Sequence, residues 1–124
     1  MKLLILLPFA VAALAGSAFA AEPFKTVKTA EGEVLAGDKG MTLYTFKKDE
    51  KGESYCYDKC AANWPPALAA SGAKAEGAYS LVTRKDGAKQ WAKDGMPLYY
   101  WIKDKKQGDA TGDGMNGVWN VAKP

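Results

Sequence analysis

Residues 40–49 read Gly-Met-Thr-Leu-Tyr-Thr-Phe-Lys-Lys-Asp, and residues 95–104 read Gly-Met-Pro-Leu-Tyr-Tyr-Trp-Ile-Lys-Asp. The same offset of 55 residues relates Trp64 to Trp119 and Asp58 to Asp113 without a gap. A register kept over this length indicates an internal duplication, with copies at about residues 31–66 and 86–121. Because each copy is too small to bury its own apolar face, we expect the two to pack on each other as one domain.

The first 20 residues have the features of an export signal. Lys2 gives a positive start, residues 3–15 are almost wholly apolar, and Ala-Phe-Ala at residues 18–20 fits the small-x-small cleavage rule. The apolar run is shorter than the roughly 20 residues that span a bilayer, and no cysteine at the cleavage point could carry a lipid. We therefore expect cleavage after residue 20, no stable membrane anchor, and a single domain over residues 21–124 in the periplasm or outside the cell.

Short β-rich segments separated by turn dipeptides follow the signal. Asp86-Gly87 and Asp94-Gly95 are strong turn signals. The expected strands are residues 24–29, 33–36 and 41–48 in copy one, and residues 79–84, 88–92 and 97–103 in copy two. This pattern predicts an all-β fold of two antiparallel meanders, each ending in its longest and most aromatic strand, with apolar residues on both faces. A short helical turn near Cys56–Asn63, ended by Pro65-Pro66, is the expected exception.

The two cysteines, Cys56 and Cys60, favour one disulfide in an exported chain. Closing so short a loop stabilises a fold by about 2 kcal/mol. The alternative is a pair for thiol–disulfide exchange or metal binding, although thioredoxin-like centres use a Cys-x-x-Cys spacing. Met41, Met96 and Met115 could join thiolates in binding copper(I). Met41 and Met96 hold equivalent positions in the two copies, however, and packing alone also explains that.

The duplication retains two aspartates, Asp49 and Asp104. A catalytic pair of carboxyl groups is one interpretation. We favour the other, in which each aspartate caps the end of its strand by accepting backbone N–H bonds from the loop that follows.

Four aromatic residues are retained with them: Tyr44, Phe46, Tyr99 and Trp101. They could form an open platform on which a ligand stacks, or they could be core. The two apolar faces of each predicted strand favour the core.

The motif Tyr-x-aromatic-x-x-Asp thus occurs twice, at residues 44–49 and 99–104. Together with Cys56-x-x-x-Cys60, Trp64-Pro65-Pro66 and Gly117-Val118-Trp119, it resembles the bacterial secreted-repeat family, whose members are often described as lipoproteins and have no known function. The resemblance covers essentially all of the chain after residue 20 and implies export and duplication, but no activity. Many relatives carry a lipid-modified cysteine, which this chain lacks.

The rest of the sequence contains few residues typical of catalytic or metal-binding sites. Histidine is absent, which removes the usual general base and the commonest transition-metal ligand. The Gly-rich loop with Asp109, Asp113 and Asn116 invites a calcium interpretation, but its spacing differs from an EF-hand and suits ordinary turns. A net charge of +3 with interleaved signs does not suggest nucleic-acid binding. We expect no enzymatic activity, no catalytic residues, no cofactor and no metal site.

These inferences predict an exported, soluble envelope protein. The leading interpretation is a non-enzymatic binding or accessory module that uses the aromatic seam or its rim to engage an envelope partner or small ligand. One alternative is a thiol–disulfide or metal-handling protein centred on Cys56 and Cys60. Another is a purely structural envelope protein with no ligand site.

Overall fold

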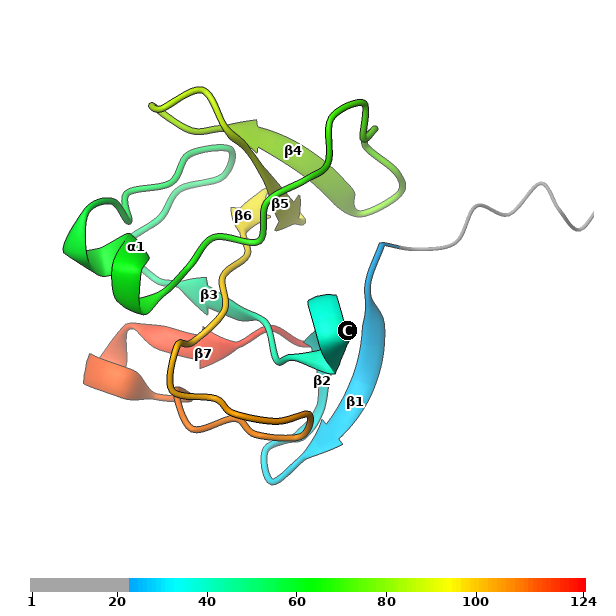
Figure 1. Cartoon of the computed structure of the whole chain (residues 1–124), viewed down its shortest axis with the longest axis vertical. Helices are drawn as coiled ribbons and strands as arrows, with labels where there is room; N and C mark the ends of the chain where they lie inside the picture. Colours follow the sequence, from blue (N-terminus) through cyan, green and yellow to red (C-terminus); the bar gives the residue numbers. More distant parts are fainter. Residues whose placement is uncertain (1–22) are drawn as a thin grey trace, which may run out of the picture.

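Figure 1 shows the computed structural model of the chain, which describes residues 23–124. The expected export signal, residues 1–20, lies outside the described residues. In chain order the elements are β1 (Lys25–Thr29), β2 (Gly32–Ala36), the 3-10 turn η2 (Asp38–Gly40), β3 (Tyr44–Phe46), α1 (Lys59–Asn63), β4 (Tyr79–Thr83), β5 (Lys89–Lys93), β6 (Met96–Pro97), the 3-10 turn η3 (Met115–Gly117) and β7 (Trp119–Val121). The prediction of an all-β fold is confirmed, and the short helix α1 falls inside the predicted Cys56–Asn63 segment.

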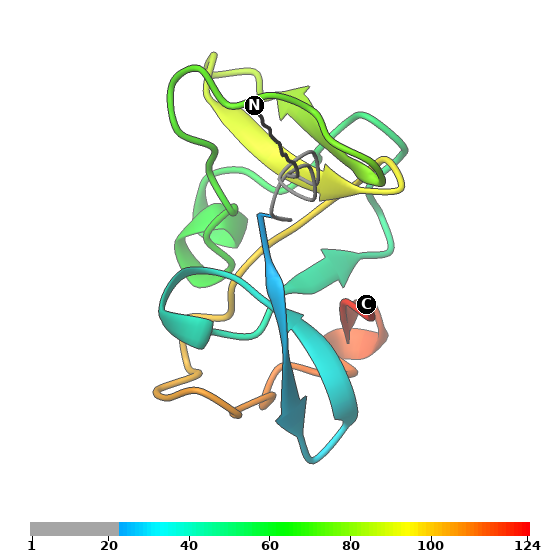
Figure 2. The same ribbon diagram turned by 90° about the vertical axis from the view of Figure 1, so that its right-hand side faces the viewer.

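Each copy begins with an antiparallel hairpin. β1 pairs with β2 so that Val27 lies opposite Val34, and both side chains are buried. β4 pairs with β5, and β5 with β6, which gives copy two a three-stranded meander. Asp94 and Gly95 both have positive φ, the geometry that this dipeptide predicts for a two-residue hairpin turn. The two hairpins lie at opposite ends of the molecule (Figure 2).

The long aromatic strands predicted over residues 41–48 and 97–103 are wrong. Within these segments only the short strands β3 and the end of β6 form. The reason is that each segment changes its backbone partner within a few residues. In copy one, Leu43 N–H donates to Leu35 O, whereas β3 directly after it pairs with β7. Since each residue has one N–H and one C=O, a continuous ladder to one partner strand cannot form along such a path.

The tail of each copy lies along the aromatic segment of the other. β3 of copy one pairs antiparallel with β7 of copy two, with Phe46 opposite Trp119 (Figure 1). In the reciprocal contact, Pro66 of copy one bridges Tyr99, and Tyr100 N–H donates to Pro65 O at 2.8 Å. The copies are therefore interlocked, so neither could keep this arrangement without the other.

An approximate twofold axis passes between the equivalent residues Tyr44 and Tyr99. Their backbones exchange N–H···O bonds, 2.8 Å from Tyr44 N to Tyr99 O and 3.0 Å in return. Trp64 and Trp119, which are also equivalent, stack with ring centroids 3.9 Å apart and planes within 3°. The repeat seen in the sequence is thus a symmetry of the core.

Buried side chains form two clusters. One surrounds the axis and holds the stacked tryptophans, and the other includes Leu35, Leu43 and Leu98. Among residues 23–124, no helix has the length and apolarity needed to cross a membrane.

Candidate functional site

The repeated motif makes two hydrogen bonds that cross the seam between the copies. Tyr44 Oη donates to Asp104 Oδ2 at 2.7 Å, and Tyr99 Oη donates to Asp49 Oδ2 at 2.7 Å. All four residues are buried. Each copy therefore supplies the partner that the buried motif of the other copy needs.

Each aspartate also binds the loop that follows it. Asp49 Oδ1 accepts the Tyr55 N–H at 2.8 Å. Asp104 Oδ1 accepts the N–H of Thr111 at 2.9 Å and its hydroxyl at 2.7 Å. The two carboxyl groups are thus bound to separate loops and separate tyrosines, which is a capping arrangement.

Burial controls protonation at the seam. It raises the pKa of Tyr44 and of Tyr99 far above the ordinary value, and the carboxyl group that accepts each hydroxyl raises it further. Burial also raises the pKa of Asp49, although hydrogen bonds from Tyr99 and from the Tyr55 N–H act in the lowering direction. The tyrosines are accordingly neutral donors at neutral pH, already hydrogen bonded, and this geometry supports a structural role.

Four aromatic rings stack in a row across the axis. The ring centroids of Phe46 and Trp119 are 4.2 Å apart, those of Trp119 and Trp64 are 3.9 Å apart, and those of Trp64 and Trp101 are 4.0 Å apart. Even the end rings, Phe46 and Trp101, are only 8% and 9% exposed. A stacking platform needs an exposed ring face, so these residues lie in the core and do not form an open platform.

Glycine is required where the chain crosses this stack. A Cβ at Gly112 would lie 2.6 Å from a ring atom of Trp64 and 3.0 Å from the ring of Trp101. The Gly112 N–H donates to Tyr44 Oη at 3.1 Å. The loop of copy two therefore seals the end of the stack from solvent.

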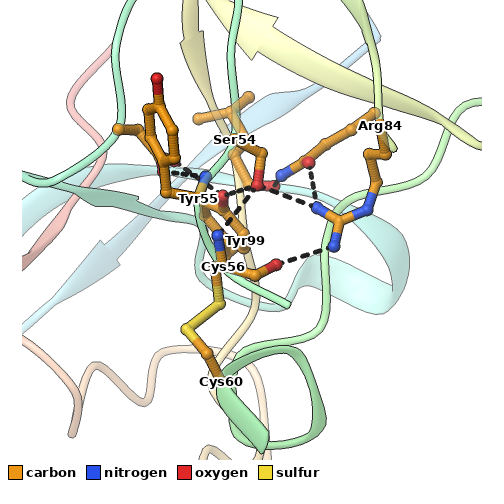
Figure 3. The surroundings of a disulfide bond; sticks show 9 residues. Ser54, Tyr55, Cys56, Cys60, Arg84 and Tyr99 are labelled. Atoms are coloured by element: carbon orange, nitrogen blue, oxygen red, sulfur yellow. Dashed lines mark hydrogen bonds between the residues drawn. A yellow bond between two sulfur atoms is a disulfide. The ribbon is translucent and has the colours of Figure 1, made fainter. Parts of the chain in front are cut away.

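The predicted disulfide is confirmed: Cys56 and Cys60 are bonded, with Cα atoms 5.2 Å apart (Figure 3). Cys56 is fully buried, and Cys60 packs against the axis cluster. Copy two has Thr111 and Met115 at the equivalent positions, and Met115 packs against the same cluster. With both thiols in the bond, neither is available as a thiolate ligand for copper.

A buried arginine beside the disulfide was not indicated by any sequence motif (Figure 3). Arg84 donates from Nη1 to Ser54 Oγ at 3.1 Å and to Gln90 Oε1 at 2.6 Å, and from Nη2 to Cys56 O at 2.8 Å. Ser54 Oγ lies 2.6 Å from Tyr99 Oη. Arg84 thus connects the hairpin of copy two to the disulfide loop of copy one. The signal for Arg84 available in the sequence was a difference between the copies, since Thr29 holds the equivalent position in copy one.

The acidic loop of copy two uses its carboxylates on backbone amides. Asp109 Oδ2 accepts the N–H groups of Lys105 and Lys106 at 2.9 and 3.2 Å, which hold the pKa of Asp109 below its usual range. Asp113 Oδ1 accepts the Val121 N–H at 2.9 Å. Over residues 23–124, no three cysteine or acidic side chains are grouped to hold a metal ion. The geometry of these carboxylates is that of turn and strand-end caps.

The family model described as a secreted repeat of unknown function matches the chain twice, over residues 25–68 and 80–123. The chain belongs to this family. The two matches are offset by the same 55 residues as the motif, and they extend the predicted repeats of 31–66 and 86–121 to include most of both hairpins. Comparison with curated proteins gave no match, and comparison with solved structures gave none.

The secreted repeat has a surface cavity beside the buried side chains of its motif. The cavity has a volume of about 210 Å³ and lies between Thr45, the β5–β6 turn and the C-terminal segment. Buried Leu98, Val121 and Ala122 line it, together with the charged residues Lys93, Asp94 and Lys123. No sequence motif pointed to this site, because its residues come from three separate segments, and those in the repeated stretch, Thr45, Met96 and Leu98, are not among the aromatic and acidic positions of the motif.

Proposed function

We propose that this secreted repeat is a non-enzymatic binding module of the cell envelope, acting in the periplasm or at the cell exterior. The family's secreted character supports export. The absence of histidine and the neutral, hydrogen-bonded state of the seam tyrosines favour binding over catalysis.

One observation carries the proposal: the side chains of the repeated motif are used inside the fold, whereas the open cavity lies where the copies differ. Thr45 lines the cavity, and its counterpart in copy two is the much larger Tyr100. Concave sites with an apolar lining and a few polar groups are typical of small-molecule binding. We therefore assign binding to the cavity and assign the motif to stability.

A thiol–disulfide function is the rival, and the burial of Cys56 weighs against it. Thiol exchange needs an accessible sulfur, and Cys56 is 0% exposed. The carbonyl oxygen of Cys56 is also bound by Arg84 at 2.8 Å, which ties this residue into the core.

Ligand-observed NMR with a library of small soluble fragments tests the proposal. We expect some fragments to bind the wild-type protein and to lose binding in Thr45→Tyr, which places a large side chain in the cavity. Lys47→Tyr is the matched control, because it adds the same side chain at an exposed position of the same segment. A wild-type protein that binds no fragment, or fragments that bind all three proteins equally, would contradict the assignment. Turnover of small disulfide substrates by the wild type but not by a Cys56→Ser, Cys60→Ser variant would favour the rival.

A further inference from the structure

The cavity lies at a position that the other half of the molecule fills with its own side chain. The twofold axis relates the cavity residues Thr45, Leu98 and Ala122 to Tyr100, Leu43 and Ala67. The backbone supports this equivalence: Ala122 N–H donates to Leu43 O at 2.8 Å, and Ala67 N–H donates to Leu98 O at 2.9 Å. The backbone around the cavity and the backbone around its equivalent in the other half therefore have the same hydrogen-bonding arrangement.

At the position that the twofold axis relates to the cavity, the side chain of Tyr100 fills the space. Its hydroxyl accepts the Asp38 N–H at 2.9 Å, and its ring packs so closely on Gly37 that a Cβ there would lie 3.0 Å from the ring carbon bearing the hydroxyl. Tyr100 also packs against the cluster that contains Leu43 and Ala67. One half of the fold thus shows what this arrangement holds: a single phenol ring with its hydroxyl at a turn.

We propose that the cavity beside Thr45 is a binding site for one phenol ring of a small aromatic compound that carries a negative charge. The inference rests on the proposed binding function and names its ligand class. The available space agrees, since the cavity has a volume of about 210 Å³ and an apolar cavity of about 150 Å³ is large enough for benzene.

The charge of the ligand follows from the residues around the cavity. Lys93 and Lys123 supply two cations against the single carboxylate of Asp94. The Lys93 side chain is 21% exposed, and its ammonium group donates to Lys123 O at 3.2 Å and lies 3.9 Å from Asp94 Oδ2. An ammonium group has three donors, so Lys93 retains capacity to bind an anionic group on the ligand.

Titration of ¹⁵N-labelled protein with four probes tests the inference: p-cresol, 4-hydroxyphenylacetate, tyramine and cyclohexylacetate. p-Cresol is the tyrosine side chain itself, the next two carry opposite charges on the same ring, and the last keeps the anion but lacks the aromatic ring. We expect 4-hydroxyphenylacetate to shift the amide signals of Thr45, Leu98 and Ala122, with a dissociation constant on the order of 1 mM. It should bind a few-fold more tightly than tyramine, and this preference should shrink in Lys93→Gln.

Two variants exchange the side chains at the equivalent positions 45 and 100. Thr45→Tyr should fill the cavity and abolish the shifts. Tyr100→Thr should instead empty the space that the Tyr100 side chain fills, and should add a second set of amide shifts at Asp38 and Leu43. Because the wild-type titration needs no variant, the inference stays testable if either variant fails to fold.

An absence of shifts with all three phenols, or binding of cyclohexylacetate as tight as that of 4-hydroxyphenylacetate, would overturn the phenol assignment. If other fragments still bind at the cavity, the proposed function stands and only the ligand class is wrong. If no compound of any class binds there, the proposed function fails as well.

Discussion

The two tyrosine hydroxyls at the seam are equivalent by duplication, yet different neighbours hold them. Tyr44 Oη accepts the backbone N–H of Gly112 and donates to Asp104. Tyr99 Oη lies against Ser54 Oγ, which Arg84 in turn binds from the other copy. One half completes the motif with the backbone of a close-packed loop, and the other with a buried side-chain network.

The loops that follow the two aspartates differ in the same way. Copy one has a disulfide and the helix α1, whereas copy two has Thr111 bound to Asp104 and Met115 in the axis cluster. The duplication has therefore retained the geometry of the seam, while the residues that support it differ between the two copies. Variants at equivalent positions therefore separate what the two halves share from what each has acquired.

The largest effect should come from the shared stack. Trp64→Ala and Trp119→Ala should each lower the free energy of unfolding by about 3–5 kcal/mol, because each leaves a large cavity in the core. Urea denaturation followed by circular dichroism measures both. Ile102→Ala, at a side chain 51% exposed, should change stability by less than about 0.5 kcal/mol. A loss below about 1 kcal/mol at either tryptophan would show that the two halves do not share the stack equally.

Arg84 belongs to one half only and should give the next largest effect. Arg84→Met should cost about 2–3 kcal/mol, since it leaves buried acceptors on Ser54, Gln90 and Cys56 without their charged donor. The matched control is Lys85→Met, which removes a neighbouring exposed charge and should be nearly neutral. Equal stability of the two variants would mean that solvent replaces the lost donor and that the network does not support Tyr99.

The disulfide should contribute less than the stack. Replacing Cys56 and Cys60 together with serine should cost about 2 kcal/mol and leave the fold intact, because the closed loop is short. Thr111→Ala, at the position equivalent to Cys56, should cost about 1 kcal/mol through the lost bond to Asp104. Loss of the native circular dichroism spectrum in the double serine variant would contradict a merely local role for the bond.

The tyrosine hydroxyls should separate the two halves by a smaller margin. Tyr44→Phe should cost about 1–2 kcal/mol, because the buried Gly112 N–H loses its acceptor. Tyr99→Phe should cost less, since Ser54 retains Arg84 and Asp49 retains the Tyr55 N–H. Amide hydrogen exchange at Gly112 should accelerate only in Tyr44→Phe. The reverse order of stability would contradict the assigned support of each hydroxyl.

Acid titration should give the smallest effect and should distinguish two aspartates by sign. The pKa of Asp49 is raised in the fold, so its contribution to stability is fully present below the ordinary aspartate pKa of about 3.9 and is lost as pH rises through the raised value. The pKa of Asp109 is lowered, so its contribution is present above that ordinary value and is lost as pH falls. Relative to Asp49→Asn, the wild type should therefore lose stability as pH rises above about 4, whereas relative to Asp109→Asn it should gain stability as pH rises toward about 4. Parallel pH profiles for the two variants would exclude this difference in environment.

Features that depend on local chemistry and on the repeat could be predicted from the sequence alone. The turn dipeptides predicted the hairpins, and two cysteines in an exported chain predicted the disulfide. The β-rich segments predicted an all-β fold, and the doubled motif predicted the duplication and the secreted-repeat family. Each of these follows from residues close in the chain or from identity at a fixed offset. The lengths of the aromatic strands were wrong because side-chain alternation does not reveal when a backbone changes partner.

The way in which the two copies complete each other is visible only in the folded protein. The bonds of Tyr44 to Asp104 and of Tyr99 to Asp49 join residues 60 and 50 positions apart, and a repeated motif is equally compatible with pairing inside one copy. The buried Arg84 and the cavity beside Thr45 arise where the copies differ, so the residues that the two copies share do not indicate them. The physical reason is that burial, hydrogen-bond partners and empty space belong to the packed pair of copies and to no single segment of the chain.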